Sequence, residues 1–451
     1  MYEKVAEFKN YIKGKDVSVI GIGISNRPLI KYLVSLGAKV TAHDKKSEAE
    51  LGDAVKEFKE MGVKLILGDN YLENLSKDII FKTPGIRCDH PKILDAKKNG
   101  STITSEMEVF FEICPAKIIA VTGSDGKTTT TTLIHTMLKE AGFDAHLGGN
   151  IGTPLMTKAE DMKESDYAVL ELSSFQLHTM KRCPDVAVIT NITPNHLDWH
   201  TDYDEYIDAK KNIMRNQKFE DILVTNAENE ITRNIANEAK GKRISFSSKN
   251  KSDIYLKNDA IYFYDEEVLK VSDIKIPGHH NIENYMAAIG AVYNLVGKDV
   301  VNKVAKSFGG VPHRIELVRT LEGVRYYNSS IDSSPNRTIN TLNVFSEPVV
   351  LIAGGKDKGI PYDEIGEPIA NHVKTLILIG ATAKIIDEAV KKTGKSVDTI
   401  FADTYEEAVL KAKESSVPGD VVLLSSASTS FDMFNNFEER GNLFKELVNK
   451  L

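Results

Sequence analysis

The sequence predicts an α/β protein of three domains, and three observations lead to this prediction. Its 451 residues exceed one ordinary core and suggest roughly three domains. Short Val- and Ile-rich runs alternate with amphipathic stretches, which is typical of parallel βα units. This alternation falls into three segments. We expect a Rossmann-like domain over residues 1–105, a central P-loop ATPase-like domain with a mostly parallel sheet over 106–310, and a C-terminal Rossmann-like domain over 311–451.

The composition excludes several classes of protein. With 41% hydrophobic and 27% charged residues, the chain is typical of an ordinary globular protein. A net charge of −7 argues against general nucleic-acid binding, although it allows a local anion pocket. The apolar runs are too short to span a membrane, and the charged start "MYEKVAEFKNYIKGKD" does not resemble a signal peptide. Three separated cysteines predict neither disulfides nor a zinc site, so we expect a cytoplasmic protein without membrane or nucleic-acid partners.

The first segment alternates strand-like runs with a helix-like stretch. The apolar run "DVSVIGIGISN" (16–26) precedes the helix-like "RPLIKYLVSLG", and the strand-like runs that follow are "KVTAHD", "KLILG" and "DIIFK". Gly21 and Gly23 follow the first strand, and Asp44 ends the next at about the ~20-residue offset of a dinucleotide fingerprint. Asn26 replaces the third glycine of that fingerprint. Three interpretations stay open: an NAD site, a Rossmann-type strand order alone, or a site for the diphosphate of a nucleotide-linked substrate.

The second and third segments repeat the α/β rhythm. In the second, "KIIAVTG" leads into "TTTTTLIHTMLKEAG", a helix closed by Gly142. Further buried strands are expected at "DYAVLEL", "DVAVITNI" and "DILVTN", and a small hairpin region is expected over residues 253–276. The third segment begins near "GGVPHRIELV". Its expected strands are "PVVLIAGG", "TLILIG", "DTIFAD" and "DVVLLSSA".

The stretch "AVTGSDGKTTTT" (120–131) resembles a phosphate-binding loop that is two residues short. In G-x-x-x-x-G-K-[ST], backbone N–H groups cradle phosphates, while the lysine and the hydroxyl meet the terminal phosphate and Mg²⁺. Here Lys127 would counter phosphate charge and Thr128 would ligate Mg²⁺. The alternative is a turn that needs glycine for geometry and threonine for capping. Because the loop joins a Val- and Ile-rich strand to a helix, we predict a nucleotide site.

Two further residues are candidate metal ligands. Glu171 ends a predicted strand whose carboxyl end faces the loop, and His196 lies in "NITPNHLDWH", just past the next strand. With Thr128 they offer ligands suited to Mg²⁺ or Mn²⁺. Taken singly, each residue is as often a surface or capping residue.

Lys210 is unusual because its helical spacing places it on an apolar face. In "DEYIDAKKNIMRN" that face also holds Tyr206, Ile207, Ile213 and Met214, whereas Lys211 points elsewhere. A lysine so placed usually extends its amino group to solvent. If desolvated instead, its pKa falls, and a neutral amine can add CO₂ to become a carbamate that binds metal.

Several stretches, in order, resemble the Mur ligases, the ATP-dependent amino-acid-adding enzymes of peptidoglycan precursor synthesis. They are "TGSDGKTT", "GGNIGTP" (148–154), "ELSSFQL" (171–177), "NITPNHLDWH" (191–200) and "GHHNIENYMAA" (278–288). The resemblance covers essentially the whole chain and accounts for the short loop. The stretch "SSASTSFDMFNNFEERGNLF" (425–444) is similar to the D-glutamate-adding members, and the D-N-P-R motif of the diaminopimelate- or lysine-adding members is missing from the sequence.

This resemblance implies the reaction. We expect an ATP-dependent acid–D-amino-acid ligase that adds D-glutamate to UDP-N-acetylmuramoyl-L-alanine through an acyl phosphate. Its products would be UDP-N-acetylmuramoyl-L-alanyl-D-glutamate, ADP and phosphate. The cofactor would be Mg²⁺ or Mn²⁺, Lys210 would be carbamylated, and the protein would be a monomer. Three rival interpretations are a folylpolyglutamate synthetase, a dinucleotide-dependent oxidoreductase and a non-catalytic ATP-binding module.

The resemblance also implies roles for individual residues. The UDP-substrate would be bound by Ile24, Ser25, Asp44, Thr83, Pro84, Gly85, Asn150 and His196. ATP would be bound by Gly123, Ser124, Asp125, Gly126, Lys127, Thr128, Thr129, Thr130, Asn281, Asn284 and Arg314. The metal ligands would be Thr128, Glu171, His196 and carbamylated Lys210, and the catalytic set would be Lys127, Glu171, His196 and Lys210. D-Glutamate would be surrounded by Lys358, Ser430, Phe431 and Phe437.

One position departs from the family pattern. Ser329, in "VRYYNSS", stands where relatives usually carry a carboxylate, and Asp332 follows three residues later. Either Asp332 compensates, or the contacts to the ATP ribose and Mg²⁺ are arranged differently.

Overall fold

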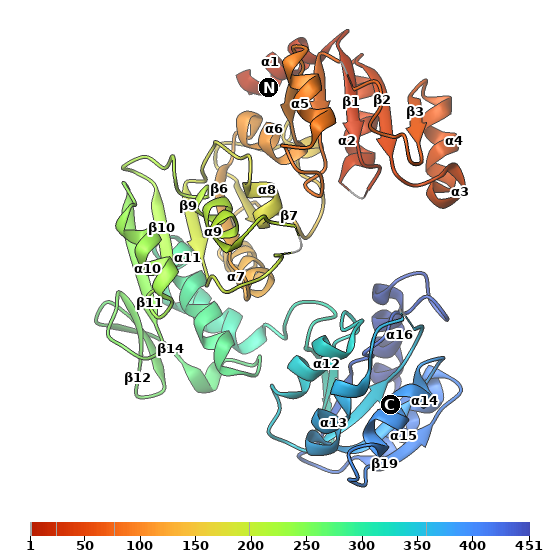
Figure 1. Ribbon diagram of the computed structural model, residues 1–451. Coiled ribbons are helices and arrows are strands. Elements are labelled where there is room, and N and C mark those ends of the chain that lie inside the picture. The colour runs from red at the N-terminus through yellow and green to blue at the C-terminus, as the bar shows by residue number, and fades with distance from the viewer. Residues whose placement is uncertain (1, 24, 76, 198, 358) are drawn as a thin grey trace. The chain divides into compact units, whose positions relative to one another are not determined.

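The computed structural model describes every residue except Met1, Ile24, Ser76, Asp198 and Lys358. Its described residues divide into two compact units, residues 1–271 with 283–304, and residues 272–282 with 305–451. Within the described part of the chain the strands form three sheets, and the pairing in them is mostly parallel (Figure 1). The predicted α/β class is therefore confirmed. Among the described residues, no helix is both long enough and apolar enough to span a membrane.

The first sheet has the strand order β3-β2-β1-β4-β5, and every pairing in it is parallel. Its strands are β1 (Asp16–Ile20), β2 (Lys39–Asp44), β3 (Lys64–Leu67), β4 (Ile79–Phe81) and β5 (Thr102–Thr104). The helices of this region are α1 (Glu3–Ile12), α2 (Asn26–Ser35), α3 (Glu48–Leu51), α4 (Asp53–Glu60) and α5 (Pro91–Lys98). Asn26 is buried and donates its amide to the carbonyl oxygens of Ile20 (3.1 Å) and Gly21 (2.9 Å). These bonds close the turn after β1 where the dinucleotide fingerprint would have its third glycine.

The second sheet has the order β14-β13-β12-β11-β10-β9-β6-β8-β7. Its strands are β6 (Lys117–Thr122), β7 (Ala145–Gly149), β8 (Tyr167–Glu171), β9 (Val186–Ile189), β10 (Ile222–Asn226), β11 (Lys242–Ser247), β12 (Ile254–Lys257), β13 (Ala260–Phe263) and β14 (Glu266–Lys270). Strands β12 to β14 pair antiparallel, so the hairpin region predicted over residues 253–276 is confirmed. The helices are α6 (Glu106–Ile113), α7 (Lys127–Glu140), α8 (Ser174–Leu177), α9 (Tyr203–Lys211), α10 (Glu230–Asn237) and α11 (His279–Ser307).

The third sheet has the order β15-β16-β20-β17-β18-β19, and only its β15–β16 pairing is antiparallel among the described strands. Its strands are β15 (Glu316–Leu321), β16 (Val324–Asn328), β17 (Val349–Ala353), β18 (Val373–Leu378), β19 (Asp398–Phe401) and β20 (Val421–Leu424). The helices are α12 (Pro335–Leu342), α13 (Gly366–His372), α14 (Ala383–Lys391), α15 (Tyr405–Ser415) and α16 (Phe437–Lys450).

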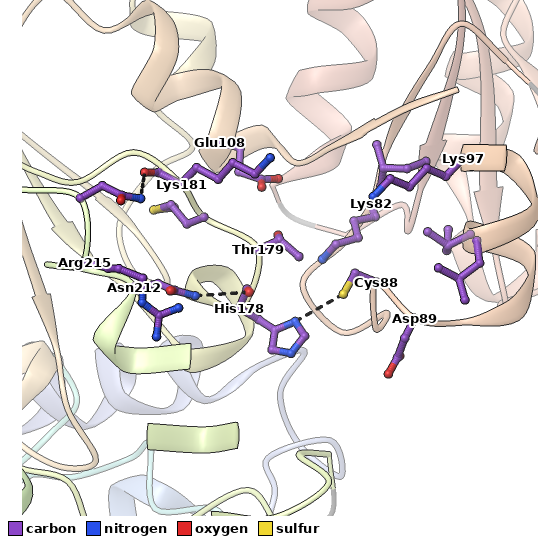
Figure 2. A pocket seen from close by; sticks show the side chains of 15 residues that line it. Lys82, Cys88, Asp89, Lys97, Glu108, His178, Thr179, Lys181, Asn212 and Arg215 are labelled. Atoms are coloured by element: carbon purple, nitrogen blue, oxygen red, sulfur yellow. Dashed lines mark hydrogen bonds between the residues drawn. The ribbon is translucent and has the colours of Figure 1, made fainter. Parts of the chain in front are cut away.

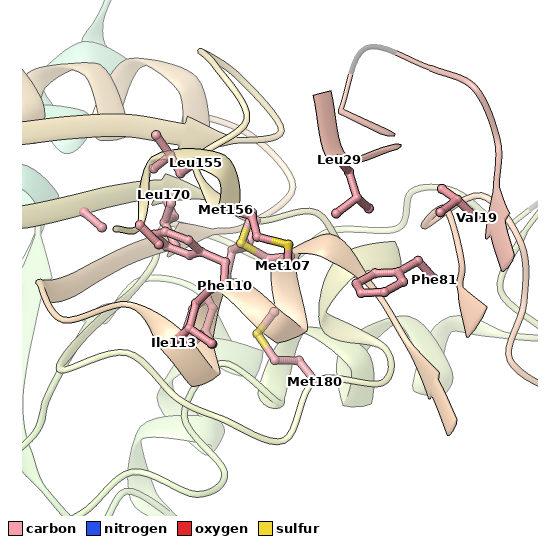
Figure 3. Packing of buried hydrophobic residues seen from close by; sticks show 14 of the residues in the cluster. Val19, Leu29, Phe81, Met107, Phe110, Ile113, Leu155, Met156, Leu170 and Met180 are labelled. Carbon is pink, nitrogen blue, oxygen red and sulfur yellow. The ribbon is translucent and has the colours of Figure 1, made fainter. Parts of the chain in front are cut away.

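One apolar cluster joins the first and second sheets within the first unit. Figure 3 shows Met107 and Phe110 of α6 between Leu170 of β8 and Phe81 of β4, and all four side chains are buried. The Ser105 hydroxyl caps α6 by accepting the N–H of Glu108 (3.2 Å), which fixes where this helix begins. Burial of these side chains stabilises the first sheet against the second through the hydrophobic effect.

A buried arginine organises one end of the third sheet. Arg440, on α16, is fully buried and donates to the Ser330 hydroxyl (2.9 Å), the Ser330 carbonyl (2.8 Å) and the Ser428 carbonyl (3.1 Å). These bonds tie α16 to the chain segments that leave β16 and β20. The sequence pattern did not predict this role, because Ser330 and Ser428 lie far from each other in the sequence and outside α16.

We predict that Arg440→Met lowers the melting temperature of the unit that contains it. The substitution leaves buried carbonyl groups without their charged donor, which costs about 3 kcal/mol and roughly 6–10 °C. Lys450→Met is the matched control, because Lys450 lies on the same helix but is exposed and pairs with its helix neighbour Glu446. Differential scanning calorimetry measures both variants. A shift for Arg440→Met no larger than that of the control would contradict the prediction.

Candidate functional site

The short loop between β6 and α7 is a tight turn that admits only glycine at two positions. Gly123 has φ +150°, and a Cβ there would lie 1.9 Å from the Thr190 hydroxyl oxygen. Gly126 has φ +76°, and a Cβ there would lie 2.3 Å from the Asn284 side-chain oxygen. The loop delivers the chain directly to α7, whose N-terminus is the positive end of the helix dipole. This geometry suits a phosphate.

Neighbouring segments hold the loop in place. The Ser124 hydroxyl is 2.8 Å from the Tyr206 hydroxyl and donates to the Thr193 carbonyl (2.9 Å). The Asp125 N–H donates to the Asn191 side chain (2.9 Å). The Ser124 side chain is thus part of the internal support of the loop, whereas Asp125 is exposed.

Three predicted site residues meet at the carboxyl end of β8. Glu171 is buried and pairs in register with Val121 of β6, which places it beside the loop. Its two carboxylate oxygens accept the Thr128 hydroxyl (2.7 Å) and the Asn150 side-chain amide (2.9 Å). A carboxylate and a hydroxyl in contact form an oxygen donor set that suits a hard divalent cation.

Two lysines converge on one carbonyl of the loop. The Gly123 carbonyl accepts the amino groups of Lys127 (3.0 Å) and Lys210 (2.7 Å). Lys127 also donates to the Ser124 carbonyl (2.9 Å), so its side chain lies along the loop.

Lys210 is only 2% exposed, and its amino group lies 4.8 Å from the centroid of the Tyr206 ring. Burial holds the pKa of the Lys210 amino group well below its ordinary value, and the nearby charge of Lys127 lowers the pKa further. The usual fate of a lysine on an apolar face, an amino group extended to solvent, does not apply here. One detail of the prediction was wrong: α9 ends at Lys211, so Ile213 and Met214 are buried in the turns that follow rather than on the helix.

The remaining predicted residues of the second sheet lie around this centre. His196 is exposed, has φ +55°, and packs edge-on against the Phe175 ring with centroids 5.0 Å apart. Thr130 donates its hydroxyl to the Asn284 side chain (3.3 Å). Thr129 lies between Thr128 and Thr130 in the first turn of α7.

The predicted residues of the first sheet gather at the carboxyl ends of β1, β2 and β4. The Asp44 carboxylate accepts the N–H groups of Ile22 (2.5 Å) and Lys46 (2.8 Å). A Cβ on Gly21 would lie 3.1 Å from the Thr83 Cβ, so the turns after β1 and β4 touch. Pro84 and Gly85 continue that second turn, and Ser25 is exposed at the start of α2. Ile24 lies outside the described residues.

The predicted site residues of the second unit differ in burial and in the residues they contact. Ser430 is buried and Phe431 is 62% exposed, whereas Lys358 lies outside the described residues. Phe437 begins α16, and its ring packs edge-on against His313 at 5.9 Å. Two further candidates lie near the junction of the units along the chain: Arg314 is exposed, and Asn281 donates its side-chain amide to the Pro277 carbonyl.

Asp332 points into the second unit. It is 5% exposed, and its carboxylate accepts the hydroxyls of Thr341 (2.8 Å) and Ser425 (2.8 Å). Burial raises the pKa of the Asp332 carboxyl. Ser329 is fully buried, and its hydroxyl accepts the Ile315 N–H (3.2 Å). Asp332 is therefore engaged internally, which favours a different arrangement of contacts over a direct replacement of the carboxylate.

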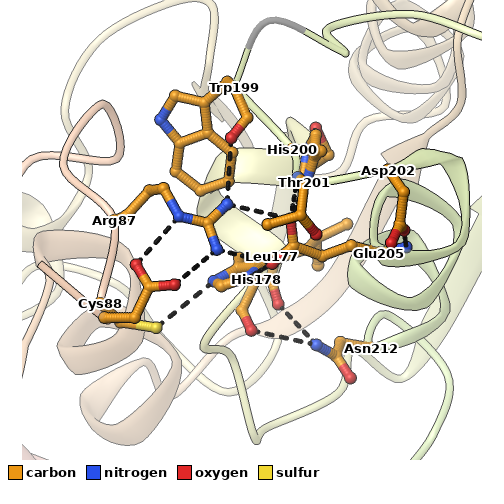
Figure 4. A network of polar contacts seen from close by, with 12 residues as sticks. Arg87, Cys88, Leu177, His178, Trp199, His200, Thr201, Asp202, Glu205 and Asn212 are labelled. Carbon is orange, nitrogen blue, oxygen red and sulfur yellow. Dashed lines mark hydrogen bonds and ion pairs between the residues drawn. The ribbon is translucent and has the colours of Figure 1, made fainter.

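The sequence interpretation missed a polar network between the first sheet and α9 (Figure 4). The Arg87 guanidinium donates to both carboxylate oxygens of Glu205 (2.9 and 2.8 Å) and lies 5.0 Å from the Trp199 ring centroid. The Trp199 indole N–H donates to the Gly85 carbonyl (3.0 Å). In the sequence, Arg87 could have been singled out because it directly follows the "KTPGI" turn, which was already a candidate site. This network fixes the helix that carries Lys210.

Models of known protein families match most of the chain. The Mur ligase MurD-like N-terminal domain matches residues 15–105, the Mur ligase middle domain matches 121–292, and the Mur ligase glutamate ligase domain matches 313–428.

Curated relatives match at high identity over full length. The UDP-N-acetylmuramoylalanine–D-glutamate ligases of Acetivibrio thermocellus and Ruminiclostridium cellulolyticum are each 55% identical, covering 100% of both chains. The ligase of the same name from Clostridium perfringens is 51% identical over 99% of both chains. Among solved structures, the UDP-N-acetylmuramate-alanine ligase of Thermotoga maritima has the same fold, with a TM-score of 0.58 at 21% identity over 97% of this chain and 99% of that one. The chain belongs to the Mur ligase family.

Proposed function

We propose that this protein is the ligase that joins D-glutamate to UDP-N-acetylmuramoyl-L-alanine with ATP. The observation that carries the proposal is the full-length identity of 51–55% to ligases of that name, together with the short phosphate loop and the Thr128–Glu171 contact beside it. The cytoplasmic location and the monomeric state stay predictions.

In this proposal the loop and the N-terminus of α7 bind ATP. The loop admits no Cβ at Gly123 or Gly126, and a helix N-terminus follows it, which fits a bound phosphate. Lys127 leaves the loop carbonyls to meet the β- and γ-phosphates of ATP. The other ATP residues in this proposal are Ser124, Asp125, Thr128, Thr129, Thr130, Asn281, Asn284 and Arg314.

The metal ligands in this proposal are Thr128, Glu171, His196 and Lys210 as its carbamate. The Thr128 hydroxyl and the Glu171 carboxylate already lie 2.7 Å apart, which fits a shared divalent cation. When bound, Mg²⁺ or Mn²⁺ supplies positive charge to the phosphate oxygens.

The buried Lys210 supports carbamylation. Burial lowers the pKa of the Lys210 amino group well below its ordinary value, which favours the uncharged amine, and only the uncharged amine is nucleophilic. Its nitrogen attacks the carbon of CO₂, an N–C bond forms, and one proton leaves to solvent. The resulting anion offsets the charge of Lys127 beneath the loop.

The two other substrates are assigned to the remaining residues. The UDP-substrate is held by Ile24, Ser25, Asp44, Thr83, Pro84 and Gly85, with Asn150 and His196 near its muramoyl group. D-Glutamate is held by Lys358, Ser430, Phe431 and Phe437.

The chemistry proceeds in two steps. First, an oxygen of the alanyl carboxylate attacks the γ-phosphorus of ATP, the bond to ADP breaks, and an acyl phosphate forms. Lys127 balances the charge on the transferring group. Then the D-glutamate amine attacks the acyl carbon, and the tetrahedral intermediate collapses to the amide and free phosphate. His196 is exposed, and relay of the amine proton to water by its ring is the alternative to its role as a metal ligand.

We predict that ADP release requires D-glutamate. Purified protein with ATP, Mg²⁺ and UDP-N-acetylmuramoyl-L-alanine is mixed with D-glutamate, L-glutamate, L-lysine or no amino acid, and ADP is measured by a coupled assay. Only D-glutamate should support sustained release, because amide formation consumes the acyl phosphate and frees the enzyme.

Release that depends on another amine would place the protein in a different branch of the family. Absence of release under every condition would contradict the proposed reaction.

We predict that Thr128→Val lowers kcat roughly 100-fold, because the hydroxyl that faces Glu171 is lost from the metal ligands. Thr128→Ser keeps the hydroxyl and should retain most of the activity. Thr132→Val is the matched control, since the Thr132 hydroxyl donates within α7, to the Thr128 carbonyl (2.7 Å). Steady-state kinetics over a range of Mg²⁺ concentrations measure all three. Equal losses in Thr128→Val and Thr132→Val would argue against a ligand role for Thr128.

A further inference from the structure

A cavity of about 510 Å³ lies away from the phosphate loop, between the turn after β4 and the segments around α8 and α9 (Figure 2). Its apolar wall includes Ile93, Leu94 and Met180. Its polar lining includes Cys88, next to Arg87 in the "KTPGIRCDHP" stretch, and His178, at the end of α8. The ligase reaction proposed above uses none of these residues.

Cys88 and His178 are in contact at the wall of this cavity. The Cys88 sulfur lies 3.6 Å from Nδ1 of His178, and Nε2 of the same ring lies 3.1 Å from a Glu205 carboxylate oxygen. This is the order thiol–imidazole–carboxylate that activates nucleophilic cysteines. Cys88 is partly exposed and lines the cavity.

Glu205 fixes the orientation and the tautomer of His178. Its carboxylate is gripped by Arg87, which holds the pKa of Glu205 well below its ordinary value. A permanently ionised Glu205 can only accept a hydrogen bond, so the proton of neutral His178 lies on Nε2. Nδ1 is then left as a base that faces the Cys88 sulfur, and it can take the thiol proton.

The cavity carries positive charge. Lys82 is 3% exposed, burial lowers the pKa of its amino group, and Figure 2 shows its side chain extending toward the Cys88–His178 pair. Lys97 and Lys181 also line the cavity. Of the lining carboxylates, Asp89 is paired with Arg87, and burial raises the pKa of Glu108. Basic side chains along the lining attract anions to the cavity.

The two other cysteines provide an internal contrast. The Cys114 thiol donates to the Ala116 carbonyl (3.7 Å), and burial raises its pKa to about 12. The Cys183 thiol donates to the Asn212 carbonyl (3.4 Å), and burial raises its pKa as well. Both therefore lie in settings that suppress the thiolate.

We propose that Cys88 is a modification site whose thiolate, formed by proton transfer to His178, reacts with small disulfides that carry carboxylate groups. The Cys88 sulfur attacks one sulfur of the disulfide, a new S–S bond forms, the old one breaks, and the second half leaves as a thiolate. The incoming disulfide is the oxidant, and Cys88 ends as a mixed disulfide within the cavity.

The first test uses the unmodified chain. The folded protein is treated at pH 7 with a substoichiometric amount of 5,5′-dithiobis(2-nitrobenzoate), a dianionic disulfide. The protein is then unfolded, its remaining thiols are blocked with iodoacetamide, and the labelled peptide is identified by mass spectrometry. We expect the mixed disulfide at Cys88, with Cys114 and Cys183 reacting at least roughly tenfold more slowly. Labelling of Cys114 or Cys183 at an equal or higher rate would overturn the proposal.

The second test asks whether the His178 imidazole speeds the reaction of Cys88, or whether exposure of Cys88 alone explains its labelling. His178→Gln removes the base and should slow labelling of Cys88 by roughly 3- to 10-fold. His90→Gln is the matched control, since it makes the same change in the segment that holds Cys88, at a ring that accepts the Lys92 N–H. Circular dichroism checks that both variants are folded. Equal rates in the two variants would overturn the role of His178, whether or not Cys88 remains the labelled residue.

The third test asks whether Cys88 reacts faster with a negatively charged disulfide than with a neutral one. Potassium chloride at 0.5 M should slow the reaction with the dianionic disulfide and leave that with neutral 2,2′-dithiodipyridine nearly unchanged, because salt screens the lysine charges. Equal salt dependence for both reagents would overturn the preference for anionic disulfides.

Discussion

The contact on which the site depends is the hydrogen bond from the buried Lys210 amino group to the Gly123 carbonyl (2.7 Å). The same carbonyl accepts Lys127, so two amino groups meet at one backbone oxygen in a place that excludes water from Lys210. Two ammonium ions at that position would repel each other, and burying both would cost further free energy of desolvation. Burial and the neighbouring charge of Lys127 lower the pKa of Lys210, which favours its uncharged amine. In the proposed function, Lys127 is the charged lysine that meets the nucleotide, and Lys210 is the amine that adds CO₂ beneath the loop.

The Lys210–Gly123 contact is anchored by neighbouring residues. It also makes the stability of the fold depend on pH. Arg87 holds Glu205 and the Ser124 hydroxyl meets Tyr206, so both ends of the contact are anchored along α9 and the loop. Because the pKa of Lys210 is lower in the folded chain, the folded chain binds fewer protons there than the unfolded chain does. Its contribution to stability thus rises with pH between the lowered pKa and the ordinary value near 10.4, and it is least favourable below that window.

Much of this fold and part of the site follow from the sequence. Val- and Ile-rich runs and glycine turns predicted the mostly parallel sheets, and the strand-loop-helix context predicted the tight loop around Gly123 and Gly126. The end of a strand predicted Glu171 beside Thr128, because neighbouring parallel strands end at one edge. Helical spacing placed Lys210 on an apolar face but left open where its amino group goes, since that depends on Gly123, far away in the chain. The Arg87–Glu205 pair and the buried Arg440 were missed for the same reason: periodicity reports which face is buried, not which distant group it meets.

The most direct test of this account is the titration of Lys210 itself. The ε-carbons of lysine are labelled with ¹³C, the Lys210 resonance is assigned by its loss in Lys210→Arg, and its shift is followed against pH in CO₂-free buffer. The account predicts a midpoint well below the ordinary lysine value of about 10.4. A midpoint at or above that value would contradict it, because Lys210 would then be charged beneath the loop and unable to take up CO₂.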